Sequence, residues 1–529
     1  MTGGDWLAAC LDRLREAGIT PAAAEPAGYL APARCLVLNA ADWGGAARVA
    51  AAAGWRHAGL WGDPVGGEIA VHACLARRGE YLVLRTRVPL GEPQLASHSP
   101  WFPGVDRLER HAHDLLGLVF AGHPDPRRWT RHQAWGENDF PLRPDFPAAG
   151  RAPKRAPADS DYPFTPVAGS AVYEIPVGPV HAGIIEPGHF RFQAVGEEVL
   201  CLEERLGYVH KGIEKIAVGR DATGLARLAG RVSGDSTVAH AWAACMALER
   251  AAGVVPPPRA QVIRAILAER ERIANHLGDI GAICNDVGFV FAHMQCARLR
   301  EAWQRGSQAV FGHRLLMDRV VPGGVFRDLT HQCRQLLLAQ CEDLSGELDA
   351  LLPLLEDYPA LEDRLVETGT LSAATARRLG CLGYVAKASG QDLDARRDHG
   401  YAPYNRLRVP SPCLQEGDVA ARLHIRAVEI RHSLELLRQL LVAPPGGEVA
   451  CPWPESAGAG AGLGMVEGWR GEIITYVRLD EGGRVARFFP RDPSWFNWPA
   501  LEALFPGNIV PDFPVCNKSV NGSYSGQDL

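Results

Sequence analysis

Closely spaced cysteines are missing from the sequence. Its 13 cysteines are scattered along the chain, and even the nearest two, Cys333 and Cys341, do not form a CxxC pair. Structural zinc sites and cubane iron–sulfur sites usually contain at least one close pair, because neighbouring thiolates converge on one metal. The spacing therefore argues against such a site built by this chain alone. It indicates reduced, mostly buried thiols instead.

An excess of basic residues and long apolar runs are absent as well. Lys and Arg number 55 against 61 Asp and Glu, which gives a net charge of −6. Nucleic-acid-binding domains are usually strongly basic, so we expect no nucleic-acid partner. No segment approaches the roughly 18 consecutive apolar residues that suggest a membrane span, and the acidic N-terminus is unlike a secretory signal. We therefore expect a soluble, cytoplasmic, multidomain protein.

The first part of the chain has the pattern of a small α+β domain. Helices are expected over 5–18 and 43–55, and strands over 35–38, 68–76 and 80–88. This domain is predicted to occupy residues 1–144 and to be followed by a proline-rich linker over residues 145–171. The sequence also contains no Walker loop, no HExxH zinc motif and no GxSxG serine elbow.

The remainder, residues 172–529, is predicted to be a mainly helical domain. Long segments with an apolar stripe and charged opposite faces lie at 259–277, 336–355 and 419–441. Strands are expected over 173–185 and 190–202, and a hairpin over 472–479 and 484–489. The glycine-rich run 458–464 lacks the GxGxxG spacing, so we interpret it as a loop.

A series of short motifs resembles one protein family. In chain order they are Gly178-Pro-Val-His181, Glu186-Pro-Gly-His-Phe-Arg191, Tyr208-Val-His-Lys-Gly-Ile-Glu-Lys215, Pro258-Arg-Ala-Gln-Val-Ile-Arg264, Pro322-Gly-Gly324, Asp394-Ala-Arg-Arg-Asp398 and Arg470-Gly-Glu472. Together they resemble the large subunit of group 4 membrane-bound [NiFe] hydrogenases, including the formate hydrogenlyase type, and the homologous 49 kDa subunit of complex I. The block from Trp101-Phe-Pro to Phe140-Pro-Leu-Arg143 resembles the complex I 30 kDa subunit, fused ahead.

The resemblance implies partners that the composition does not show. It implies a small subunit similar to the complex I 20 kDa subunit, which holds an iron–sulfur cluster, and membrane subunits related to proton pumps. It also implies a peripheral position on the inner face of the cytoplasmic membrane. We expect no cofactor in this chain itself, and a quinone is a candidate electron acceptor.

The sequence departs from this family at the nickel ligands. A working [NiFe] large subunit supplies four thiolates from two CxxC motifs, because soft thiolates suit nickel and low-spin iron. The matching positions here are Ser233, Ser236, Ser523 and Gly526, so no thiolate remains. The chain stops at Leu529, shortly after the second pair, which suits either an encoded or a processed end.

The missing thiolates predict a hydrogenase-related protein without normal nickel–iron occupancy. We expect a subunit that couples electron transfer to ion translocation and has no hydrogenase activity of its own. The first alternative is a quinone-reducing subunit of a complex I-like NADH or ferredoxin dehydrogenase, and the second, less favoured, is an active [NiFe] hydrogenase. The quinone alternative lacks its expected tyrosine near Arg231; its expected histidine would be His181 or His189.

Five residues are candidates for the site. The resemblance places Glu186 where active hydrogenases relay protons, and burial of such a carboxylate would raise its pKa; the alternative is a salt-bridged hairpin residue. Arg231 and Arg470 either line the former metal cavity or form structural ion pairs with Asp398 or Glu472. Asp235 either accepts a proton or a hard ion, or caps the helix that follows it. His181 is the fifth candidate.

Overall fold

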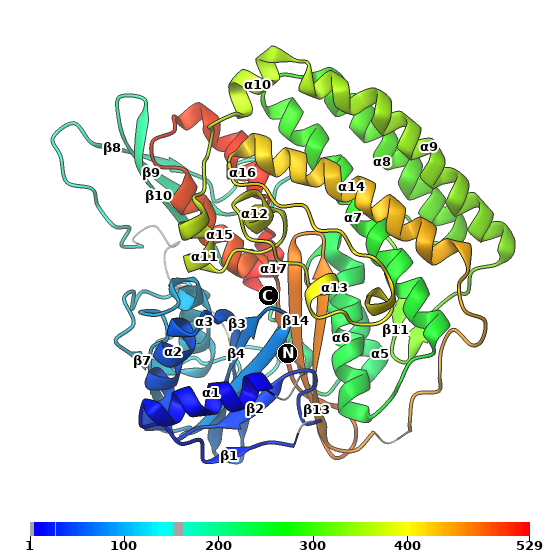
Figure 1. The fold of residues 1–529 in the computed structure, drawn as a ribbon. Helices are drawn as coiled ribbons and strands as arrows, with labels where there is room; N and C mark the ends of the chain where they lie inside the picture. The colour runs from blue at the N-terminus through cyan, green and yellow to red at the C-terminus, as the bar shows by residue number, and fades with distance from the viewer. Residues whose placement is uncertain (1–4, 27, 152–161, 456) are drawn as a thin grey trace.

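The computed structural model describes residues 5–26, 28–151, 162–455 and 457–529 (Figure 1). Part of the predicted linker, residues 152–161, therefore lies outside the described residues, and the described remainder of it contains no helix or strand. We refer to residues 5–144 as the N-terminal domain and to residues 172–529 as the large domain.

The N-terminal domain is built on a five-stranded sheet with the order β1-β2-β5-β4-β3. Its elements are α1 (Asp5–Glu16), β1 (Ala23–Ala24), β2 (Arg34–Val37), η1 (Ala40–Asp42), α2 (Trp43–Ala52), β3 (Arg56–Val65), β4 (Glu68–Arg77), β5 (Glu80–Pro89), β6 (Gln94–Ala96), η2 (Pro103–Val105), α3 (Asp106–Leu116) and β7 (Val119–Ala121). The α+β class and the expected helices and strands are confirmed. The pattern missed β3 and α3.

The large domain is mainly helical, as predicted. Its elements up to the bundle are β8 (Tyr173–Val177), β9 (His189–Val195), β10 (Glu198–Arg205), α4 (Ile213–Ala217), α5 (Ala222–Ala229), η3 (Gly234–Ser236), α6 (Thr237–Ala252), α7 (Pro258–Asp286), α8 (Val290–Phe311), β11 (Val320–Val321), β12 (Gly324–Val325) and α9 (His331–Glu356). The rest are α10 (Pro359–Leu365), α11 (Ala373–Leu379), α12 (Gly383–Ala388), α13 (Ala395–Asp398), η4 (Tyr404–Arg406), α14 (Val419–Val442), β13 (Gly460–Gly468), β14 (Gly471–Leu479), β15 (Val485–Arg491), α15 (Ser494–Leu504), η5 (Val510–Asp512), α16 (Phe513–Val520) and α17 (Tyr524–Asp528).

The long helices α7, α8, α9 and α14 pack together on one side of the molecule (Figure 1). Their starts follow from local signals: α7 begins with Pro258 in its first turn, and the Asp418 carboxylate accepts the Ala421 N–H at the start of α14 (2.7 Å). The predicted strand over 173–185 ends at Val177. Residues 178–188 form the loop of a projecting hairpin, in which Ile184 is fully exposed.

The glycine-rich run that we interpreted as a loop is instead part of strand β13. The strand pairs with β14 from Gly460↔Leu479 to Gly468↔Gly471 and lies against helix α6. An ideal Cβ on Gly460, Gly462 or Gly464 would lie 2.1, 2.2 or 1.9 Å from a carbonyl oxygen of α6. Glycine has a low strand propensity, so the composition hid the strand, but only glycine lets the helix backbone approach this closely.

One hydrophobic cluster spans both domains, while the helical bundle has a cluster of its own. A single cluster of buried side chains joins Leu82 and Trp61 of the N-terminal sheet to Leu463 and Phe489 of the large domain. Polar contacts reinforce it, among them the Arg491 guanidinium donating to Ala58 O and the Arg487 guanidinium donating to Gly62 O, each at 2.8 Å. The domain boundaries therefore stay a prediction. None of the helices in the described ranges is long and apolar enough to cross a membrane.

The close contact between β13 and α6 leads us to a prediction about stability. Gly464→Ala should lower the free energy of unfolding by about 1–3 kcal/mol, because the added methyl would overlap the Ala243 carbonyl and force the helix away. Chemical denaturation of the purified protein measures this change. Gly346→Ala is the matched control: Gly346 is exposed within α9 with open space around it, so alanine should raise stability by about 0.5–1 kcal/mol. Equal stability of the Gly464→Ala and native proteins would contradict the packing argument.

Candidate functional site

The four positions expected to have lost their thiolates come together in the structure. Ser233 precedes η3 and Ser523 precedes α17, and their hydroxyl oxygens lie 2.8 Å apart although 290 positions separate them. The Ser523 hydroxyl also accepts the Gly526 N–H (2.9 Å), so it caps α17. An ideal Cβ on Gly526 would lie 2.7 Å from the Asp492 carboxyl carbon, so the side-chain space at this position is already filled.

Arg470 and Asp235 form an ion pair beside these hydroxyls. Two guanidinium nitrogens of Arg470 contact the two Asp235 carboxylate oxygens at 2.7 and 2.6 Å, and Nε donates to Asn521 O at 2.6 Å. The Asp235 carboxylate also accepts the Ser233 hydroxyl (2.7 Å). Burial raises the pKa of Asp235, but the attraction of Arg470 outweighs it and the pKa is lowered overall. The two predicted residues therefore meet at the site, and Arg470 pairs with neither Asp398 nor Glu472.

A second buried carboxylate, Asp492, was missed by the sequence analysis. It accepts a hydrogen bond from His240 Nε2 (2.8 Å) and from the Ser494 N–H (2.8 Å), and both His240 and Asp492 are fully buried. Burial alone would raise its pKa, but the bond and the charge of His240 lower the pKa of Asp492 to about 2. No motif marks this aspartate, because only folding brings β15 to the start of α6. His240 itself is a buried, hydrogen-bonded residue within α6.

The C-terminal segment adds another buried carboxylate, Asp528, to the site. Asp528 accepts the N–H groups of Gly207 and Val209 at 2.9 and 3.0 Å, at the start of the motif that begins at Tyr208. Burial raises the pKa of Asp528 to about 7, and the nearby negative charge of Glu186 adds to this. Lys211 donates to the Val232 carbonyl (2.9 Å), and burial lowers the pKa of Lys211. This pair of titratable groups was not singled out from the sequence.

Two expectations about the site are wrong in detail. Glu186 reaches its rim, where its carboxylate accepts the Ser525 N–H (2.9 Å), but it is exposed rather than buried, because the hairpin loop that carries it projects from the fold. Arg231 does not line the site. Its guanidinium turns to the surface, where it forms a two-point ion pair with Asp318 at 2.6 and 2.8 Å.

The predicted histidines of the hairpin have different surroundings. His181 Nε2 lies 3.2 Å from the Tyr524 hydroxyl, next to Ser523 in sequence. Burial lowers the pKa of His181 and raises that of Tyr524. His189 is held inside, between the Gly178 carbonyl and the Arg191 guanidinium. No tyrosine closely follows Arg231 in the sequence. Instead Tyr524, near the C-terminus, contacts His181 of the hairpin loop.

The donor groups at the centre do not fit a nickel–iron cluster. They are hydroxyls and carboxylates, which are hard oxygen ligands, and they already bond to one another, to Arg470 and to His240. Among the described residues, no group of three or more His, Cys, Asp and Glu side chains is arranged to hold a metal ion. The low pKa values keep the Asp235 and Asp492 carboxylates charged at neutral pH, whereas Asp528 at the C-terminus, whose pKa is about 7, is poised to exchange a proton.

Comparison with known proteins identifies three matching family models. Residues 47–152 match the 30 kDa subunit of respiratory-chain NADH dehydrogenase, residues 286–457 match its 49 kDa subunit, and residues 211–278 match the nickel-dependent hydrogenases. The order of the matches agrees with the order of the motifs along the chain.

Individual relatives cover most of the chain. Formate hydrogenlyase subunit 5 of Escherichia coli is 32% identical over 85% of this chain and 79% of the relative. The carbon monoxide-induced hydrogenase of Rhodospirillum rubrum is 35% identical over 66% of this chain and 98% of the relative. A solved chain of the membrane-bound sulfane sulfur reductase, an archaeal respiratory membrane complex, superposes with a TM-score of 0.64 at 26% identity and covers 68% of this chain and 99% of that chain.

The buried Asp492–His240 pair makes a prediction about acid stability. The folded-state pKa of Asp492 is about 2, below its ordinary value of 3.8, so its stabilising contribution is present above about pH 4 and is lost as the pH falls toward 2. Asp492→Asn cannot titrate, so its free energy of unfolding should fall less steeply than that of the native protein between pH 4 and 2. At pH 7 the variant should be less stable by about 1–3 kcal/mol.

Denaturant titrations at several pH values measure both effects. The matched control is Asp343→Asn, because Asp343 is exposed on α9. It should leave the acid limb of the stability profile unchanged. Parallel acid limbs for Asp492→Asn and the native protein would contradict the assignment.

Proposed function

Since the chain belongs to the family that unites the large subunits of membrane-bound hydrogenases with the 30 and 49 kDa subunits of respiratory NADH dehydrogenase, we propose that it couples electron transfer to ion translocation without nickel chemistry. Its relatives are named as hydrogenase and NADH-quinone oxidoreductase subunits, and the superposed chain belongs to a respiratory membrane complex. The chain is accordingly an oxidoreductase subunit of the type found in membrane complexes.

One observation carries the nickel-free proposal. The hydroxyls of Ser233 and Ser523 bond directly to each other, and Asp492 fills the side-chain space of Gly526, at the positions where the family places thiolates. A neutral hydroxyl is a poor ligand for nickel, and the pair leaves no open donor between the two segments. In this proposal electrons pass from a reduced donor through the cluster of a small iron–sulfur partner to an oxidised acceptor bound outside this chain. This chain contributes the fold, the proton-exchanging groups and the contacts to membrane subunits at the inner face.

A second candidate function is quinone reduction, and the His181–Tyr524 pair favours it. A histidine and a tyrosine hydroxyl 3.2 Å apart would converge on one carbonyl oxygen of a quinone headgroup and supply a proton to that oxygen on reduction. Electrons would come from the partner's cluster. The two side chains lie at the edge of the hydroxyl cluster, between the hairpin loop and α17.

Metal content and quinone reduction of the native complex separate these functions. The complex is purified from membranes through a tag on this chain. We expect iron from the partner and nickel below about 0.1 atom per chain, because the hydroxyl positions do not bind soft metals. Elemental analysis measures both metals, and nickel near one atom per chain would overturn the proposal.

Quinone reductase activity is measured on the same preparation. The coupling function expects none. Activity that falls in Tyr524→Phe but persists in Tyr358→Phe, an exposed tyrosine that stacks on Phe289, would establish the second candidate instead.

Glu186 is the residue that we propose as the proton relay at the rim of the site. Its carboxylate is held against α17 by the Ser525 N–H, one residue from Tyr524 and close to Asp528, whose pKa of about 7 suits proton exchange at neutral pH. The relay thus depends on this contact and not on burial of Glu186.

Glu186→Gln should slow proton translocation by roughly tenfold or more, since a positioned acid–base group typically contributes about 10²–10⁴-fold. Glutamine keeps the hydrogen bond to Ser525, so assembly should be unaffected. Proton uptake by the complex in vesicles measures the effect, and Glu197→Gln, an exposed carboxylate at the β9–β10 turn, is the control. Native rates in the assembled Glu186→Gln complex would make Glu186 a structural residue.

A further inference from the structure

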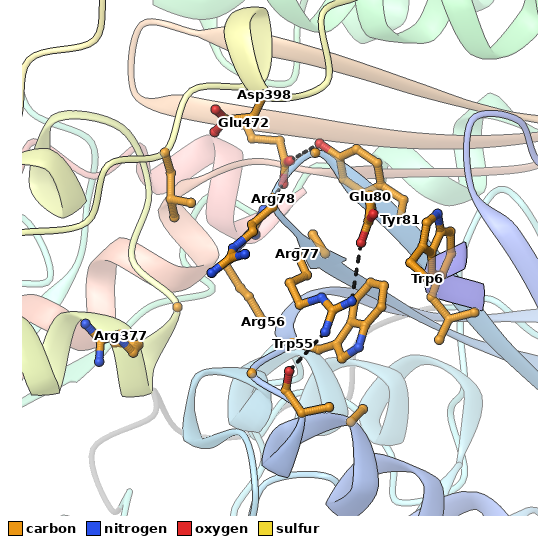
Figure 2. A pocket seen from close by; sticks show the side chains of 18 of the residues that line it. Trp6, Trp55, Arg56, Arg77, Arg78, Glu80, Tyr81, Arg377, Asp398 and Glu472 are labelled. Atoms are coloured by element: carbon orange, nitrogen blue, oxygen red, sulfur yellow. Dashed lines mark hydrogen bonds and ion pairs between the residues drawn. The ribbon is translucent and has the colours of Figure 1, made fainter. Parts of the chain in front are cut away.

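A cavity of about 610 Å³ lies between the N-terminal domain and the large domain, away from the hydroxyl cluster. Its walls come from α1, the end of α2 and the β4–β5 turn on one side, and from α11, α12 and α13 on the other. Figure 2 shows its lining side chains. The described lining residues include none of Ser233, Ser523 and Asp492. Its volume is in the range of small-molecule sites, which often lie at domain interfaces.

One end of the cavity is aromatic. The rings of Trp6 and Trp55 lie 5.5 Å apart and are tilted by 56°, and the Arg77 guanidinium lies 4.7 Å from the centre of the Trp55 ring. Arg77 is held in place by the Ala53 carbonyl and the Glu80 carboxylate. Trp55 is buried and is covered by Arg77, whereas Trp6 is only partly buried, so the apolar ring surface that this end offers to a planar ligand is mainly that of Trp6.

The other end carries cations without carboxylate partners. Figure 2 shows Arg78 and Arg377 on the side opposite Trp6 and Trp55. Both are exposed. Arg377 contacts only Gln391 among the described residues (3.3 Å), and Arg78 has no hydrogen bond or ion pair within that part of the chain.

The carboxylates that line the cavity do not neutralise these arginines. Each is paired elsewhere, in the pairs Glu472 with Arg56 and Arg491, Asp394 with Lys387 and Arg396, Asp398 with Arg397, and Glu80 with Arg77. Burial raises the pKa of the remaining one, Glu467, to about 8, so it is largely neutral at physiological pH. The charge left over in the cavity is therefore positive.

The conformation of Arg78 is itself unusual. Arg78 and Gly79 are the two residues of a tight turn between β4 and β5, and both have positive φ, +50° and +80°. Asn, Asp or Gly is normally found at the first of these positions, and another residue there costs roughly 1–2 kcal/mol. The backbone of the turn cannot move toward the large domain, because it already packs against it: an ideal Cβ on Gly79 would lie 1.9 Å from the Asp398 carbonyl. Strain of this kind is common where a side chain serves a ligand.

We propose that this cavity binds an anion of the nucleotide class, with the base against Trp6 and Trp55 and the phosphates against Arg78 and Arg377. The planar guanidinium fork matches phosphate oxygens, and the indole rings match a flat heterocycle. Because the ligand would contact both domains, it would bias how they sit against each other. The proposal does not depend on the function proposed for the hydroxyl cluster.

Calorimetric titration of the native complex with ADP tests the proposal. We expect a Kd below about 1 mM, at least fivefold weaker binding for Arg78→Gln and for Arg377→Gln, and a similar loss for Trp6→Leu. Arg378→Gln is the matched control, because Arg378 is exposed on the same short helix but does not line the cavity, and it should bind ADP normally. Adenosine and pyrophosphate should each bind at least fivefold more weakly than ADP, since each reaches only one end.

The location is checked independently by cysteine labelling. Cys10 lines the cavity, whereas Cys413 is exposed elsewhere, so ADP should slow alkylation of Cys10 and leave that of Cys413 unchanged. The proposal is overturned if ADP does not bind at 1 mM, if Arg78→Gln binds ADP with native affinity, or if ADP does not change the alkylation rate of Cys10. Pyrophosphate binding as tight as ADP would equally overturn the assignment of a base to the tryptophan end.

Discussion

The pairing of Arg470 with Asp235 holds the centre of this protein together. Arg470 follows β13, Asp235 lies in η3 before α6, and the same guanidinium donates to Asn521 near the C-terminus. Three segments that are far apart in the chain are therefore joined by the Arg470 guanidinium group. An arginine removed from water demands such partners, because an unpaired buried charge costs several kcal/mol. The hydroxyl cluster, the cap on α17 and the position of Tyr524 all depend on this contact.

The same constraint shapes the helical bundle. Lys387 contacts Asp394 and Glu429 at 2.7 and 2.6 Å, and His276 contacts the other oxygen of Glu429 at 2.7 Å. Arg396 joins Asp394 to Glu269. Positive and negative groups alternate in this interior network, so each of its charges meets an opposite one. One of the motifs that define the family resemblance, the one at Asp394, lies in this network, which explains it as a structural requirement.

The centre of the molecule is a group of hydroxyls and carboxylates that bond to one another and to Arg470 and His240. The segments around Ser233 and Ser523 still converge, but hydroxyls bond across the gap and Asp492 fills the remaining volume. Next to this group, beside the projecting hairpin, lies Asp528, whose pKa of about 7 suits proton exchange. The two domains are joined by a hydrophobic cluster and enclose a cavity between them. A ligand bound in that cavity would contact both domains.

Much of this organisation was determined by the sequence itself. Apolar periodicity placed α7, α9 and α14, and the order of the motifs identified the two fused parts and the four thiolate-free positions. The sequence could not show that Gly460–Gly464 is a strand, because its glycines are explained only by the backbone of α6 beside them. Nor could it show that Arg231 turns to Asp318, that Asp492 and Tyr524 reach the site, or that Glu186 stays exposed. Those outcomes depend on contacts between residues 87 to 343 positions apart, which local patterns do not encode and which only the packed tertiary structure decides.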